Sequence, residues 1–97
     1  MAVYILLSKL TSIGRKTINA NPGRIKEVNK EIETFGAKVV EQYVTLGPYD
    51  FVSIVEAPDN KTIAKISVEL GSRGTIVITT LPAIGLNEFI STIKKKK

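Results

Sequence analysis

The sequence predicts one α+β domain whose elements follow the order βαββαβ. Four short segments are rich in strand-forming residues, two segments repeat apolar residues at helical spacing, and glycine, proline or asparagine separates them. The chain has 97 residues, near the commonest size of one domain and too short for two independent cores. We therefore expect a single domain over residues 1–93, followed by a lysine tail at residues 94–97.

The first part of the chain predicts a strand, a polar connection and a helix. Residues 3–10 are apolar at nearly every position, which is typical of a strand covered on both faces. Residues 11–20 form a polar connection with at most a short helical turn. Asn21 and Pro22 predict a helix start, with Asn21 as N-cap and Pro22 at the first helical position, and Gly36 ends this helix. Its apolar stripe consists of Ile25, Val28, Ile32 and Phe35.

The second part predicts three strands and two helices. The strands are expected at residues 38–46, 51–57 and 75–81, and the first two are joined by a turn over residues 47–50. Asp59 is a suitable N-cap for a helix that ends at Gly71. This helix is expected to bury Ile63, Ile66 and Leu70. A short terminal helix follows at residues 86–93.

This order is the split-βαβ, or ferredoxin-like, arrangement: a four-stranded antiparallel sheet with two main helices on one face, here with a short C-terminal helix added. Two amphipathic helices cover one face only, yet the strands are apolar on both. In the first strand Val3, Ile5 and Leu7 alternate with Tyr4 and Leu6, and the later strands follow the same pattern. We therefore expect a second subunit on the open face, with a cavity between the subunits. The alternative is that the terminal helix folds across that face.

Composition excludes several kinds of chemistry. The chain has no histidine, cysteine or tryptophan, so the sequence predicts no metal site, no cofactor and no disulfide. The net charge is +5, but four of the fourteen basic residues are the terminal lysines, which leaves ten basic against nine acidic residues. The body is nearly neutral, and a nucleic acid is not an expected partner. No leader peptide or membrane-spanning run is evident, which predicts a cytoplasmic protein.

Four short motifs carry a resemblance to a known family. TLGPYD at residues 45–50, EAPD at 56–59, LGSRG at 70–74 and TLPA at 80–83 occur in this order over nearly the whole chain. Together they resemble the GYD domain family. The resemblance implies a ferredoxin-like subunit akin to the dimeric α/β barrel group, and it implies no reaction. Gly85 and Asn87 depart from the family's pattern before the terminal helix, which predicts weaker capping there.

Three residues are candidate ligand contacts: Tyr4, Tyr49 and Asp50. If both lie in regular strand, Tyr49 and Asp50 point to opposite faces. Asp50 is expected to accept hydrogen bonds from nearby backbone N–H groups, and the alternative is a carboxylate at the mouth of the cavity. Tyr49 suits an aromatic lid or an interface anchor, and Tyr4 a core or interface aromatic with a bonded hydroxyl.

The leading hypothesis is a non-enzymatic, self-associating protein that holds a small, mostly apolar ligand between its subunits. The first alternative is a cofactor-independent, monooxygenase-like enzyme of the dimeric α/β barrel type, with Asp50 or a tyrosine as base. The second alternative is weak nucleic-acid binding through the lysine tail. No catalytic residue is assigned.

Overall fold

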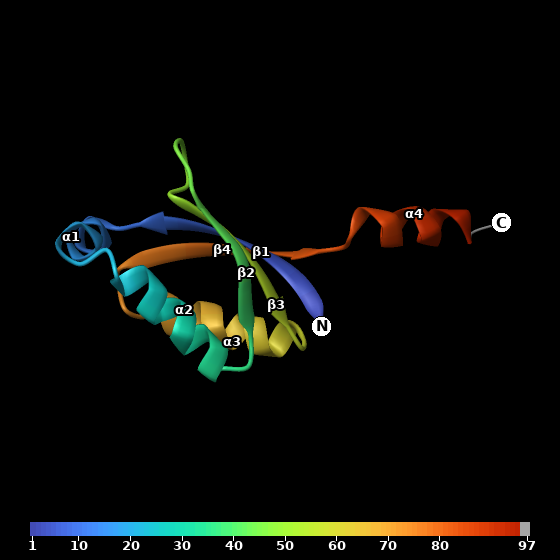
Figure 1. Ribbon diagram of the computed structural model, residues 1–97, viewed down its shortest axis with the longest axis horizontal. Coiled ribbons are helices and arrows are strands. Elements are labelled where there is room, and N and C mark those ends of the chain that lie inside the picture. The colour runs from blue at the N-terminus through green and yellow to red at the C-terminus, as the bar shows by residue number, and fades with distance from the viewer. Residues whose placement is uncertain (96–97) are drawn as a thin grey trace.

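A computed structural model describes residues 1–95 and shows one four-stranded antiparallel sheet (Figure 1). Its strands are β1 (Ala2–Leu10), β2 (Lys38–Val44), β3 (Phe51–Ala57) and β4 (Ile76–Ala83). Their order across the sheet is β2-β3-β1-β4, so the two strands nearest the middle are β1 and β3. The predicted ferredoxin-like α+β fold is confirmed.

Four helices accompany the sheet: α1 (Ser12–Ala20), α2 (Arg24–Thr34), α3 (Asn60–Gly71) and α4 (Leu86–Lys94). Figure 1 shows α2 and α3 on the same face of the sheet, with α1 beyond one end of it. The last helix, α4, extends away from the other end. The sheet therefore has one face covered by helices and one open face.

The core lies between the sheet and the two main helices. Tyr4, Leu6 and Val55 point from the central strands toward Ile66 of α3, and all four side chains are buried. The three α3 residues predicted to be buried, Ile63, Ile66 and Leu70, are buried. On α2 only Ile32 is fully buried, and Val28 and Phe35 pack against the core while partly exposed.

Several local predictions are confirmed by the backbone. The Asp59 carboxylate caps α3 by accepting the backbone N–H of Thr62 at 2.9 Å. The same hydrogen bond, followed by one from the Thr62 hydroxyl, holds the pKa of Asp59 below its ordinary value. Gly36 ends the α2 region with a φ of 96°, the left-handed conformation that favours glycine.

The link between the first strand and the first main helix differs from the prediction. Residues 12–20 form a complete helix, α1, whose N-cap is Thr11: its hydroxyl accepts the backbone N–H of Gly14 at 3.1 Å. Asn21 was predicted as the N-cap of the next helix and Pro22 as its first residue, and both predictions are wrong. Asn21 is instead the C-cap of α1, its N–H donating to Thr17, because a residue before proline is disfavoured in helical conformation. The next helix, α2, begins at Arg24 with Gly23 as N-cap.

A glycine lets α1 pack directly on the backbone of the α3–β4 connection. A Cβ atom at Gly14 would overlap the carbonyl oxygen of Thr75 and lie 3.2 Å from Cδ2 of Leu10. The Thr11 backbone N–H donates to the same Thr75 carbonyl at 3.0 Å, and the Thr11 hydroxyl donates to Gly74 at 2.8 Å. This contact joins residues more than sixty positions apart and fixes α1 against the sheet.

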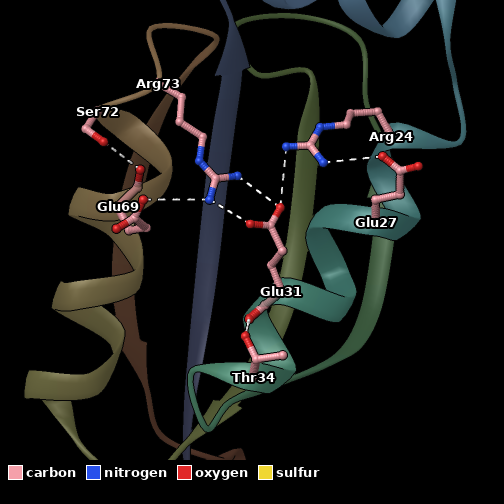
Figure 2. Close-up of polar contacts among 7 residues, drawn as sticks. All are labelled: Arg24, Glu27, Glu31, Thr34, Glu69, Ser72 and Arg73. Atoms are coloured by element: carbon pink, nitrogen blue, oxygen red, sulfur yellow. Dashed lines mark hydrogen bonds and ion pairs between the residues drawn. The ribbon is translucent and has the colours of Figure 1, made fainter.

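Ion pairs join α2 to the end of α3 (Figure 2). The Arg73 guanidinium donates to both carboxylate oxygens of Glu31, at 3.0 and 2.7 Å. Arg24 approaches Glu31 from the other side, with Nη2 3.4 Å from Oε1. The hydrogen bonds from Arg73 hold the pKa of Glu31 below its ordinary value, and the same bonds raise the pKa of Arg73.

Candidate interaction surface

The open face of the sheet is apolar at its centre. The strand register places Ile54, Ile5 and Leu81 side by side in one row across β3, β1 and β4. The next row contains Tyr43, Val52 and Leu7, from β2, β3 and β1. None of these side chains is buried, and Tyr43 and Leu81 are 56% and 42% exposed. With Val3 and Val77 at its two ends, this set of eight side chains is called the open-face patch below.

Charged residues lie around the open-face patch. Lys38 of β2 is paired in register with Glu56 of β3, at the end of the sheet where Val3 lies. Lys9 pairs with Val77 at the opposite end. An apolar centre surrounded by charges of both signs is the usual anatomy of a protein–protein interface.

The terminal helix does not cover this patch. Figure 1 shows α4 continuing away from the end of β4, and no residue of α4 is buried. The extension accounts for a long axis of 55 Å and a radius of gyration of 15.0 Å, against about 12.5 Å for a compact domain of this length. Within residues 1–95, therefore, no segment packs over the open face.

The exposed side of α4 is itself apolar. Leu86, Phe89, Ile90 and Ile93 recur at helical spacing and are between 41% and 72% exposed. The helix begins after Gly85, which provides no side-chain cap. This agrees with the weaker capping expected from the sequence. An amphipathic helix with no intramolecular partner is a candidate contact for another molecule.

Asp50 holds the backbone of two strands together. Its Oδ2 accepts the backbone N–H of Leu10 at 2.8 Å, and its own N–H donates to the Ser8 carbonyl at the same distance. The Asp50 carbonyl accepts the N–H of Thr45 across the hairpin, also at 2.8 Å. Asp50 thus links the β2–β3 hairpin to β1. This is the role expected from its place in a turn, where the carboxylate accepts a hydrogen bond from a backbone N–H.

Tyr4 and Tyr49 lie far from each other. Tyr4 is buried on the helix-covered face, where its hydroxyl donates to Oδ1 of Asn60 at 2.6 Å. Tyr49 precedes β3, and its carbonyl accepts the Thr45 hydroxyl at 2.7 Å. Because Tyr49 and Asp50 stand outside regular strand, the alternation rule does not apply to them. Tyr4 pairs with Val55, at the far end of β3 from Asp50, so the structure does not bring the three candidates into one site. Ligand binding by any of them stays a prediction.

In residues 1–95 no three Asp or Glu side chains are placed to hold a metal ion. None of the helices in that range is both long and apolar enough to cross a membrane.

Fold and surface together define a small ferredoxin-like domain with an uncovered apolar sheet face. The chain belongs to the GYD domain family, whose family model matches residues 4–93. It is 50% identical over 95 residues to the glutamine synthetase and cystathionine beta-lyase binding protein of Thermus thermophilus, a match that covers 97% of this chain and 100% of that protein.

A solved structure with a similar fold comes from the same bacterium. The crystal structure of TTHA0845 from Thermus thermophilus matches with a TM-score of 0.56 and 22% sequence identity. The match covers 88% of this chain and 95% of that one. At this identity the similarity establishes the fold alone.

Proposed function

We propose that this protein is a non-enzymatic, cytoplasmic protein-binding module that self-associates through the open-face patch. The observation that carries the proposal is an apolar sheet face that no part of residues 1–95 covers. Each large apolar side chain kept in water costs about 1.5–3 kcal/mol relative to burial. A second copy of the chain, laying its own sheet against this one, would bury the patch on both subunits at once. We also propose that a small, mostly apolar ligand is held between the two sheets.

The charged rim supports a second copy as the occupant. Lys38 and Glu56 lie beside each other at one end of the patch, and Lys9 lies at the other end. In a two-fold interface the same patch faces itself, so a surface that carries both charges can form pairs with its own copy.

We further propose that α4 contacts a different protein. Leu86, Phe89, Ile90 and Ile93 follow the i, i+3, i+4, i+7 spacing of a helix laid into a groove of its target. The relative from Thermus thermophilus is named as a binding protein for glutamine synthetase and cystathionine beta-lyase. At 50% identity over nearly the whole chain, those two enzymes are the first partners to test.

Self-association is tested by light scattering coupled to size exclusion at micromolar concentration. The subunit mass is 10.6 kDa, and we expect the wild-type protein to elute at twice that mass or more. Leu81→Asp places a charge in the central row of the patch and should give a monomer. Val68→Asp is the matched control, because Val68 is an exposed apolar residue of α3 on the other side of the sheet. A monomeric wild-type protein would refute the self-association.

The role of α4 is tested by calorimetric titration of each enzyme, purified from the organism that supplies this chain. The double variant Phe89→Ala/Ile93→Ala should weaken binding at least tenfold, since both side chains are exposed anchors and neither supports the core. The control is Asn87→Ala on the same helix, which should keep the wild-type affinity. If neither enzyme binds the wild-type chain, the proposed partners are wrong. That result would leave the proposed self-association unaffected.

A further inference from the structure

A cavity lies on the opposite side of the sheet from the open-face patch. It has a volume of about 240 Å³ and is bounded by the middle of the sheet, by α1, by α2 and by the end of α3. Its walls are mainly aliphatic. They include Leu6, Ile18, Ile25, Val28, Leu70 and Ile76. An apolar cavity of about 150 Å³ is large enough to bind benzene, so this one has room for a substituted ring.

Two features leave this cavity open: an ion pair that links the two main helices, and small side chains on the sheet that faces them. Arg73 reaches from the end of α3 to Glu31 of α2 and bridges the gap between the helices (Figure 2). Beneath this bridge the helix-covered face of the sheet carries Ser8 and Ser53, which are much smaller than the leucine or phenylalanine that usually fills such a position. The missing side-chain volume leaves the space open.

One side of this cavity is polar. Asn29 of α2 donates to Oε1 of Gln42 at 2.7 Å, and Nε2 of Gln42 donates to the Ser53 hydroxyl at 3.1 Å. Ser8 is only 5% exposed and lines the cavity, yet its hydroxyl takes part in none of the side-chain hydrogen bonds within residues 1–95. Since no fully buried side-chain N or O atom in that range lacks a hydrogen-bond partner, the Ser8 hydroxyl is open to the cavity, where a bound acceptor can take the place of water.

Charge at the rim decides which kind of molecule suits the cavity. Arg24 and Arg73 stand there beside Glu27, Glu31 and Glu69, so two positive charges face three negative ones. Both guanidiniums already donate to carboxylates. A carboxylate or phosphate ligand would meet no free positive charge at this rim, whereas an uncharged ligand avoids the large cost of removing a charge from water.

We infer that this cavity binds an uncharged, mostly apolar small molecule that carries one hydrogen-bond acceptor, such as a ketone. The aliphatic walls hold its body, and its acceptor accepts a hydrogen bond from the Ser8 hydroxyl. The site is formed within one subunit, on the helix-covered face. Ligand binding at this site is therefore independent of the self-association and enzyme binding proposed above.

Three probes of equal size separate the alternatives: acetophenone, which is neutral with one acceptor; cumene, which has no acceptor; and benzoate, which is charged. Binding is followed by NMR of isoleucine δ1 methyl groups, because the isoleucines report the two faces separately. Ile76 and Ile78 line the cavity, whereas Ile5 and Ile54 belong to the open-face patch. We expect acetophenone to shift the Ile76 and Ile78 signals, cumene to bind more weakly, and benzoate not to bind.

The variant Ser8→Ala removes the hydroxyl and nearly preserves the volume. It should weaken acetophenone binding by between about twofold and about tenfold, the range of one net hydrogen bond, while cumene binding is unchanged. Ser91→Ala in α4 is the matched control and should bind all probes as the wild type does. The proposal is overturned if acetophenone shifts no cavity methyl signal, because that result would mean that only water fills the space. It is also overturned if only Ile5 and Ile54 respond, if Ser8→Ala has no effect, or if benzoate binds best.

Discussion

Replacing Gly14 by alanine tests whether the position of α1 depends on direct backbone packing. The added methyl would overlap the Thr75 carbonyl oxygen and lie 3.0 Å from the Thr75 carbonyl carbon, so α1 must move outward. Overpacking of this kind costs about 1–3 kcal/mol, and loss of the Thr11–Thr75 hydrogen bond adds about 1 kcal/mol. Alanine recovers about 1 kcal/mol through its higher helix propensity. The net expectation is a loss of about 1–3 kcal/mol.

Thermal unfolding followed by circular dichroism measures this loss. For a chain of this size the expected decrease in Tm is about 5–20 °C. The matched control is Gly71→Ala, because Gly71 is also helical but has no atom within 4 Å of the position a Cβ would take. That variant should be as stable as the wild type or more stable by up to about 1 kcal/mol. The reasoning fails if Gly14→Ala unfolds at or above the wild-type temperature.

Two further perturbations concern polar groups with defined partners. Asp50→Ala removes the acceptor of the Leu10 N–H and should lower the free energy of unfolding in urea by about 1–2 kcal/mol, whereas Asp50→Asn keeps an acceptor and should cost less; equal losses would argue against the hydrogen bond. The pKa of Glu31 is depressed in the folded state by Arg73, so the stability from this pair is complete above the ordinary value of 4.5 and is lost as pH falls through the lower folded value. Glu31 is about one-third exposed, so the effect is about 0.5 kcal/mol. Between pH 7 and pH 3 Glu31→Gln should flatten the stability profile by that amount, and Glu33→Gln should leave it unchanged.

Local sequence patterns were sufficient for most of the elements. Asp59 and Gly36 mark a helix start and a helix end through interactions with their immediate neighbours, so each could be recognised without knowing the fold. The apolar alternation along residues 3–7 also identified the open-face patch, because side chains of a strand alternate between faces in any sheet.

The failed Asn21 cap has a local cause, the proline that follows it, whereas two other features involve residues distant in sequence. The sequence predicts a polar connection in place of the helix α1, although Thr11 is a suitable N-cap and the inward residues 14, 17 and 18 have helical spacing. Its packing rests on a contact between Gly14 and Thr75 that no local pattern displays. The cavity depends in the same way on Ser8 of β1 and Ser53 of β3 lining one space together with Arg73.

The amino-acid order alone determined the element types, the antiparallel α+β architecture and the presence of more apolar strand surface than two helices can cover. These properties follow from side-chain periodicity and capping, which act over a few residues. Tertiary structure decided that α4 points away from its own sheet, that Asp50 binds backbone of another strand, and that a pocket opens between the sheet, α1, α2 and the end of α3. Each of these depends on groups that are far apart along the chain and meet only after folding.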